Sequence, residues 1–333
     1  MKIVSVSMVK NESDIIESFI RYTLSFVDEM IILDNGSTDE TTKIVDNLIN
    51  EGLSIVLIHD KDKYYNQSIK TTKLLKKAVN EYGADLVCIL DVDEFIFTNG
   101  NNPRDDLEKL DPNYYYLIKL IHYIPTPDDD YDIKFIPKRI THCAEPPESV
   151  YKVIVPKKIV KDNNVEVLMG NHDLKFKGLR KSNLSKYAPN LKIAHYCIRS
   201  KEQCMSKILV GWPNMVAVYT ESTDFGWHWK EFFNKIKRYN DISPEELEYF
   251  SKCYVSMANP DEVILEYEPI NLDFCKSIEI KYIFQYNYLN NILESYVNFA
   301  NEVALLKREL DFKTGKTGLI QGLKMKIVDL ILK

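Results

Sequence analysis

Two aspartates two residues apart, Asp91 and Asp93, directly follow a short apolar run at 86–90. A run of this length predicts a buried strand, and ligands of open α/β sheets bind beyond the carboxyl ends of strands. Paired carboxylates are hard oxygen ligands that suit Mg²⁺ or Mn²⁺. A divalent ion in turn suits a diphosphate, because it neutralises the charge that develops when the diphosphate leaves. The pattern therefore predicts metal-assisted chemistry on a diphosphate.

The chain before residue 100 alternates patterns typical of strands with amphipathic helical patterns, at 2–8, 12–26, 29–33, 40–51, 54–58, 67–82 and 86–90. This order predicts a Rossmann-like, mainly parallel sheet covered by helices, with right-handed crossovers. Asp34 and Asp60 follow the second and third strand patterns. We therefore expect both at the same sheet edge as Asp91 and Asp93.

Composition limits the class of protein. Of 333 residues, 45% are hydrophobic and 28% charged, which is ordinary globular usage. The net charge of −6 argues against nucleic acid as a partner, because phosphate binding usually requires basic excess. Six scattered cysteines indicate neither a disulfide framework nor a zinc ribbon, and Cys197 and Cys204 near His195 match no usual four-ligand spacing. No signal peptide or membrane span is indicated, so we expect a cytoplasmic protein.

Three segments carry motifs in a fixed order: Ser-Val-Ser-Met-Val-Lys-Asn-Glu at 5–12, Leu-Asp-Asn-Gly-Ser-Thr-Asp at 33–39, and Leu-Asp-Val-Asp-Glu-Phe at 90–95. Together they resemble the family 2-like glycosyltransferases of the GT-A fold, and the last is similar to the aspartate-x-aspartate-glutamate-phenylalanine box of a bacterial branch. The resemblance implies a GT-A catalytic domain at 1–230, followed by a helical C-terminal region at 231–333. It also implies metal-dependent sugar transfer from a nucleoside diphosphate, with a UDP-sugar as donor and Mn²⁺ or Mg²⁺ as cofactor.

The resemblance further implies a role for each matching residue. The nucleotide pocket takes Val9, Asn11, Asp34 and Asp60, with Asp60 supporting the base. Asp93 binds the metal directly, whereas Asp91 contacts the ribose or a water in the metal shell.

The resemblance continues more loosely to about residue 212, through a basic strand at 151–156, a G-x-H box at 170–173 and an H-Y-x-x-R-S-x-x-Q segment at 193–203. In many GT-A enzymes a late histidine completes the metal shell, and His195 is the candidate here. Positive charge for the diphosphate is expected from Lys152, Arg199 and Lys207.

No matching motif supplies the general base. Inverting family 2 enzymes carry a Glu-Asp pair before a helix in the acceptor half, and this sequence has no such pair in that context. An attacking hydroxyl still needs a carboxylate or imidazole within hydrogen-bond reach. His172 and Asp173 are the best-placed candidates, with Glu145 weaker. The stereochemical course therefore stays open.

Two other functions remain open at this stage. One is a nucleotidyltransferase, although 7–14 lack the glycines of its usual loop; the other is a non-catalytic module that binds nucleotide sugars or glycans. For a transferase, we expect a glycan or lipid-linked acceptor in cell-surface polysaccharide synthesis.

The second half of the chain changes pattern. Strand patterns at 114–123, 134–136, 150–155 and 165–168 are separated by turns, and helix returns at 201–210. A long helical pattern at 279–310 and an apolar, lysine-bearing one at 319–333 follow. They predict either homo-oligomerisation through 279–333 or peripheral contact with an anionic membrane at its inner face.

Overall fold

The computed structural model describes residues 1–60, 66–100, 102–162, 164–176, 184–219, 227–256, 259–282 and 288–314. Its first part alternates strands and helices as the sequence predicts: β1 Ile3–Val9, α1 Ile16–Thr23, β2 Glu29–Asp34, α2 Thr41–Asn50, β3 Ile55–His59, α3 Gln67–Asn80 and β4 Leu86–Ile89. β1 pairs in parallel with both β2 and β4, and β2 pairs in parallel with β3. The carboxyl ends of these strands therefore meet at one edge.

The second part extends the sheet with mostly antiparallel strands. Its strands are β5 Glu94–Phe97, β6 Tyr115–Ile124, β7 His142–Ala144, β8 Tyr151–Pro156, β11 Ser185–His195 and β12 Glu266–Tyr267. The order along the sheet is β12-β7-β6-β8-β4-β1-β2-β3. β11 lies beside both β6, in parallel, and β5, antiparallel. This flanked sheet confirms the α/β class predicted above.

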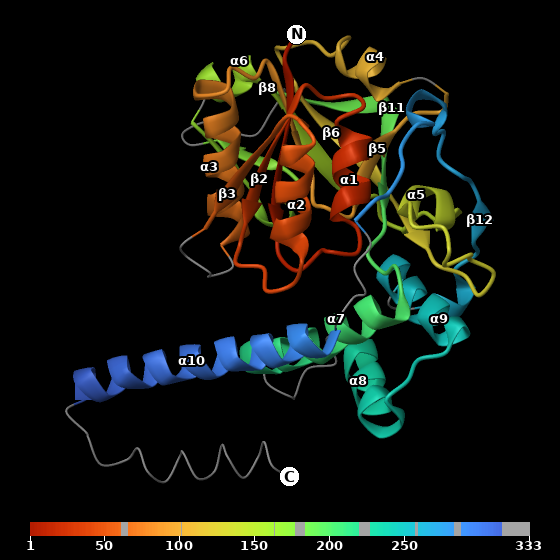
Figure 1. Cartoon of the computed structure of the whole chain (residues 1–333). Helices are drawn as coiled ribbons and strands as arrows, with labels where there is room; N and C mark the ends of the chain where they lie inside the picture. The colour runs from red at the N-terminus through yellow and green to blue at the C-terminus, as the bar shows by residue number, and fades with distance from the viewer. Residues whose placement is uncertain are drawn as a thin grey trace.

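Helices cover both faces of the sheet because the strand residues alternate sides. On β1, Ile3 and Val9 pack on one side with α1 and α2, whereas Val4 and Val6 pack on the other with α3. Figure 1 shows α1 and α2 in front of the strands. The short elements around this core are α4 Pro103–Leu107, α5 Ile136–Arg139, α6 Lys157–Asp162, β9 Val165–Val167, η1 Met169–Asn171 and β10 Leu174–Phe176.

A helical region follows β11, with α7 Lys201–Tyr219, α8 Trp227–Tyr239, α9 Pro244–Val255, η2 Pro260–Glu262, η3 Asp273–Cys275 and α10 Tyr288–Thr314. α10 runs along α7 beneath the α/β body (Figure 1). The division at residue 230 falls inside α8, and β12, from the predicted helical region, pairs with β7 of the main sheet. Across the described ranges, no helix has both the length and the apolar character needed to cross a bilayer.

Two predictions of local structure are wrong. The strand predicted at 134–136 does not form. The short helix α5 begins at Ile136 instead, with Pro137 in its first turn, where proline is favoured. The helix predicted at 279–310 does not include Lys281 and Tyr282, because their backbone N–H groups donate to the Glu17 carboxylate. The described helix α10 spans Tyr288–Thr314. The predicted helix at 319–333 lies outside the described residues.

Candidate functional site

A cleft of about 550 Å³ opens over the carboxyl ends of β1 and β4. Its walls carry many ionisable side chains, including Glu12, Asp91, Asp93, Glu94, Lys152, His172 and His195. They come from segments far apart in the chain, and the sheet brings them together because β11 ends beside the start of β5. The strand-end rule that singled out Asp91 and Asp93 thus leads to a cavity.

Asp93 and His195 face each other in this cleft. β11 pairs with β5 so that His195 lies opposite Glu94, and the Tyr196 N–H donates to the Asp93 carbonyl at 2.8 Å. His195 Nε2 lies 3.4 Å from Asp93 Oδ2. Burial alone would raise the pKa of Asp93, but its interactions with His195, Lys207 and Arg199 hold the pKa well below its usual range. Asp93 is therefore an anion with a ring nitrogen directly beside it.

Three ligand atoms fit a hard divalent ion at this position. One from each of Asp93, Glu94 and His195 lies within 4.8 Å of the other two. Two carboxylates and an imidazole are a donor set that Mn²⁺ accepts readily and Mg²⁺ tolerates. The residues present therefore fit the predicted metal, with Glu94 added to Asp93 and His195.

Asp91 is held in a different way. Its carboxylate accepts hydrogen bonds from Lys152 Nζ at 2.7 Å, Asn171 Nδ2 at 3.1 Å and Gln67 Nε2 at 3.2 Å. Lys152 also pairs with Glu94 at 2.7 Å. Burial raises the pKa of Glu94 to about 8 against the opposing effect of Lys152. Asp91 still lines the cleft, so its contact with the ribose or a metal-bound water stays a prediction.

Two of the three predicted cations, Lys152 and Arg199, pair with carboxylates of this protein. Arg199, only 2% exposed, donates to Asp14 at 2.8 and 2.9 Å and to Glu12 at 2.7 Å. Its Nη1 also lies 3.9 Å from Asp93 Oδ2. Lys207 donates to the Cys197 carbonyl at 3.0 Å and lies over the Tyr254 ring. Lys152 and Arg199 therefore hold the carboxylates of the site in place.

The predicted nucleotide-pocket residues lie in three places. Val9 lines the cleft directly. Asn11 and Asp34 shape the turn after β2, because the Asn11 side chain accepts from the Thr38 N–H and Asp34 accepts from the Ser37 N–H. Asp60 pairs with Lys70 at 2.6 Å and lines a second cavity of about 290 Å³.

Lys70 connects the second cavity with the cleft. Its ammonium also donates at 2.6 Å to Asn35 Oδ1, on the cleft wall. Lys70 therefore links Asp60 to the cleft wall.

Of the two candidate bases, the structure brings His172 to the cleft. Its Nδ1 lies 2.8 Å from the Tyr151 carbonyl, so Nδ1 donates and Nε2 keeps its lone pair. Burial lowers the pKa of His172, which favours the neutral ring. Asp173 instead accepts from the Tyr115 hydroxyl at 2.7 Å and is absent from the described lining of the cleft. Glu145 pairs with Lys119.

Gly170, which lies against the His172 ring, allows a test of the role of His172. Gly170 has a φ of +74°, and a Cβ there would lie 2.4 Å from His172 Nε2. We expect Gly170→Ala to displace the ring and lower turnover at least about tenfold, beside a backbone cost of about 1–2 kcal/mol. Gly83→Ala is the matched control, because Gly83 has a φ of +70° with nothing within 4 Å. Thermal melts and donor turnover of both variants check this; equal turnover in the two would contradict it.

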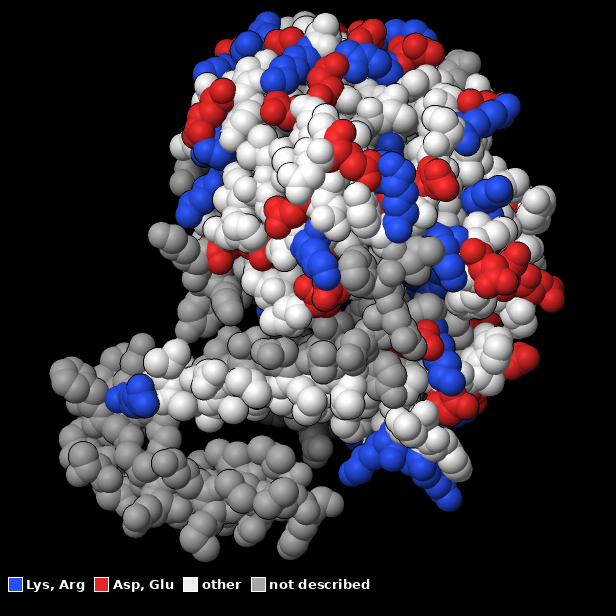
Figure 2. All heavy atoms as spheres, viewed as in Figure 1, with Lys and Arg blue, Asp and Glu red and all other residues white. Residues whose placement is uncertain are grey.

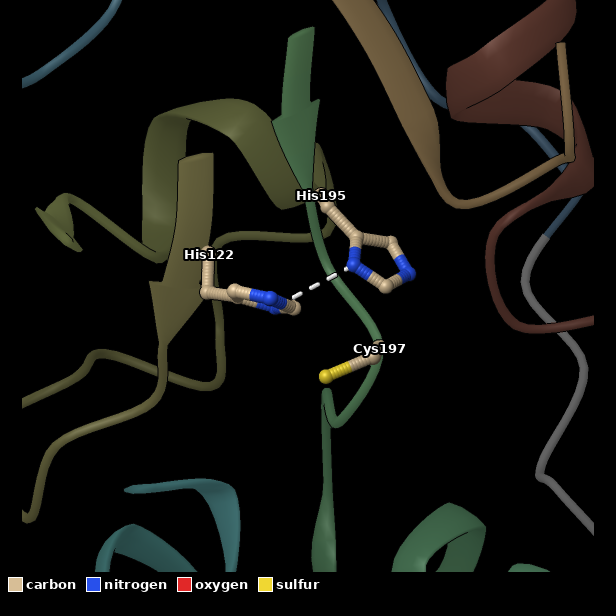
Figure 3. Close-up of side chains that lie close together, drawn as sticks. All are labelled: His122, His195 and Cys197. Atoms are coloured by element: carbon tan, nitrogen blue, oxygen red, sulfur yellow. Dashed lines mark hydrogen bonds between the residues drawn. The ribbon is translucent and has the colours of Figure 1, made fainter. Parts of the chain in front are cut away.

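Sequence reasoning missed His122. This residue stands near the end of β6, directly opposite His195 in the parallel register of β11, and the two Nδ1 atoms lie 3.2 Å apart (Figure 3). Burial lowers the pKa of His122 to about 3, so the ring is neutral. An Nδ1–H on His195 would leave its Nε2 free for a metal, a common arrangement for metal-binding histidines. The strand-end rule used for Asp91 does not single out His122, because His122 lies inside the strand pattern at 114–123 rather than after it.

Residues 6–100 match the family model "Glycosyl transferase family 2". No curated protein matches the chain. Among solved structures, S. aureus TarS 1-349 in complex with UDP is 15% identical with a TM-score of 0.37, covering 78% of this chain and 82% of that one.

Two further structures are similar at the same level. GalNAc-T7 with UDP, GalNAc and Mn²⁺ is 11% identical with a TM-score of 0.37, covering 78% of this chain and 57% of that one. The mannosyltransferase PcManGT from Pyrobaculum calidifontis, in complex with GDP-Man and Mn²⁺, is 11% identical with a TM-score of 0.34, covering 78% and 75%. Because these TM-scores are low, the functional proposal below rests on the family match and the site geometry.

Proposed function

We propose that this chain is a glycosyltransferase, the enzyme class that the match of residues 6–100 to the family model supports. It moves a sugar from a UDP-sugar to a glycan or lipid-linked acceptor, with Mn²⁺ or Mg²⁺, in cell-surface polysaccharide synthesis on the cytoplasmic side of the membrane. The observation that carries the metal-dependent part is the 3.4 Å approach of His195 to Asp93, which are about a hundred residues apart in sequence.

Each group of the site then has a task. Asp93 and His195, with Glu94, would hold the divalent ion, which when bound supplies positive charge to the leaving diphosphate. Arg199 keeps Asp93 and Glu12 in position through its contacts with both carboxylates. Lys152 fixes Asp91 and Glu94 relative to one another. The His172 Nε2 lone pair is available to take the proton of the acceptor hydroxyl.

A donor screen tests this proposal against its rivals. The full chain is incubated with a panel of sugar nucleotides and Mn²⁺, and released nucleotide is measured. Release of UDP that stops with EDTA supports the transferase. Release of pyrophosphate from a nucleoside triphosphate and a sugar phosphate would identify a nucleotidyltransferase, and binding without any turnover would identify a non-catalytic module.

The choice of base gives a second prediction. We expect His172→Gln to lower kcat by about 10²–10⁴-fold while donor affinity changes little. Asp173→Asn should keep kcat within a few-fold and instead cost about 1–2 kcal/mol of stability, because Asp173 holds Tyr115. Single-turnover rates, donor titrations and thermal melts separate these effects. Collapse of kcat in a well-folded Asp173→Asn enzyme would transfer the role to Asp173.

The C-terminal region carries the third part of the proposal, association with a second copy. Seven apolar side chains of α10 are between 43% and 67% exposed: Leu289, Leu293, Tyr296, Val297, Phe299, Leu305 and Leu306. α10 has three cations against four carboxylates, and its described surface in Figure 2 is mostly uncharged. An anionic membrane attracts basic helices, so this near-neutral apolar face suits another copy of the chain better.

We therefore expect the full chain to be oligomeric and Leu293→Asp with Val297→Asp to shift it towards the monomer. Asn301→Asp, on the same helix, is the control and should leave the oligomer intact. Light scattering after size exclusion measures both. A monomeric full chain that co-sediments with anionic vesicles, when a chain ending at Phe312 does not, would favour the membrane instead.

A further inference from the structure

A second trio of ligand atoms meets on the other side of His195. His122, His195 and Cys197 each place one ligand atom within 4.8 Å of the others. Figure 3 shows the two imidazole rings with the Cys197 sulfur beneath them. His195 faces both groups: Nδ1 lies 3.2 Å from His122 Nδ1, and Nε2 lies 3.4 Å from Asp93 Oδ2.

The backbone fixes this trio. His122 and His195 are opposite one another in the parallel pairing of β6 with β11. Two residues further on, the Cys197 carbonyl accepts from Lys207 Nζ at 3.0 Å and from Gln203 Nε2 at 3.2 Å. His122 is 6% and Cys197 2% exposed, so neither side chain is free to move into solvent. The three ligand atoms are therefore held close together before any ion arrives.

The ligand atoms of this trio suit a softer ion than the two carboxylates, Asp93 and Glu94, do. Two imidazole nitrogens and a thiolate sulfur are typical zinc ligands, with bonds of about 2.0–2.1 Å to nitrogen and about 2.3 Å to sulfur. Bonds of that length in a tetrahedron separate two nitrogens by roughly 3.3 Å, close to the 3.2 Å between the two Nδ1 atoms. Three protein ligands with a fourth position for water are common in zinc sites. Both rings line the cleft, which gives the ion a path from solvent.

We propose that His122, His195 and Cys197 form a zinc site. This site competes with the Asp93 and Glu94 carboxylates for the His195 ring. Zinc replaces the hydrogen bond between the two Nδ1 atoms. The thiol proton leaves to solvent, and the proton kept by the His195 ring resides on Nε2, where it is donated to Asp93. His195 Nε2 then has no lone pair for a metal beside Asp93. Zinc is therefore an inhibitor, a consequence that rests on the proposed function, whereas the zinc site itself does not.

Cobalt is the probe of the ligand set, because a cobalt–thiolate bond gives a charge-transfer band that oxygen and nitrogen ligands do not give. The full chain is titrated with Co²⁺, and zinc affinity is measured by competition with a chelator. Cys197→Ser removes the sulfur, and His122→Gln removes one nitrogen. Cys204→Ser is the matched control, since Cys204 is equally buried in the same apolar cluster but lies outside the trio. Asp93→Asn keeps the trio and removes the carboxylate opposite.

We expect one cobalt per chain with the thiolate band in the wild type, Cys204→Ser and Asp93→Asn proteins. The band should vanish in Cys197→Ser, and zinc affinity should fall more than tenfold in Cys197→Ser and His122→Gln. A wild-type protein without the band, or a band that survives Cys197→Ser, overturns the zinc site.

Turnover tests the inhibitory consequence separately. Zinc should suppress Mn²⁺-dependent donor turnover of the wild type, and the same zinc concentration should leave Cys197→Ser at least tenfold less inhibited. Equal inhibition of both proteins refutes competition through this site. If no metal supports turnover in the wild type, the proposed function fails, while the cobalt spectrum still decides the zinc site.

Discussion

Asp93→Asn strongly lowers metal-dependent turnover while the protein stays folded: this is the first large effect that we expect. Asparagine keeps the shape of the side chain but removes the negative charge beside His195 and Glu94. Loss of one electrostatic contact of this kind costs about 10²–10³-fold in kcat. The fold should survive because Arg199 keeps its partners Glu12 and Asp14.

Asp105→Asn, the same change on the exposed surface of α4, is the matched control and should retain full activity. Initial rates with Mn²⁺ and with EDTA, together with a thermal melt, give the comparison. A folded Asp93→Asn enzyme that turns over at the wild-type rate would remove Asp93 from the mechanism.

The second large effect concerns stability. Arg199→Met should lower the free energy of unfolding by about 3–5 kcal/mol, because the change leaves the partly buried carboxylates of Glu12 and Asp14 without their buried cation. Tm should fall by roughly 5–10 °C. Arg104→Met is the control: its side chain is 30% exposed and pairs with Asp28 and Glu108 at the surface, so the loss should stay under about 1 kcal/mol.

The loss in Arg199→Met should also depend on pH. Burial raises the pKa of Glu12 to about 8 even though Arg199 lowers it, and removing Arg199 raises it further. A carboxyl whose pKa is raised by folding stabilises at low pH and loses that contribution as pH rises. The variant should therefore be less impaired at pH 6 than at pH 9. Urea unfolding at both pH values measures this, and a deficit independent of pH would mean that Glu12 does not respond to Arg199.

The parallel half of the sheet was predictable because its signals are local. Each strand from β1 to β4 has its own apolar run, and Asp91 and Asp93 directly follow one of them. Residues that meet Asp93 from elsewhere were harder to find. His195 came from a resemblance, and His122 was missed, because their approach depends on β11 inserting between β5 and β6, a pairing that no local pattern encodes.

The partners of the basic residues were also predicted only in part. Lys152 and Arg199 were predicted to meet a diphosphate, and sequence alone could not show that each is buried against carboxylates of this protein. The start of α10 was misplaced for a similar reason, since Glu17 in α1 binds the backbone at 281–282 from far away in the chain. Long-range polar contacts, rather than local propensity, account for these differences.

The most direct test of the central claim is calorimetric titration of the full chain with UDP, with Mn²⁺ present and then with EDTA. If Asp93, Glu94 and His195 hold the ion that binds the diphosphate, UDP affinity should fall at least tenfold in EDTA. The Asp93→Asn protein should show the weak affinity under both conditions. Equal UDP affinity of the wild-type protein with Mn²⁺ and with EDTA would contradict the account.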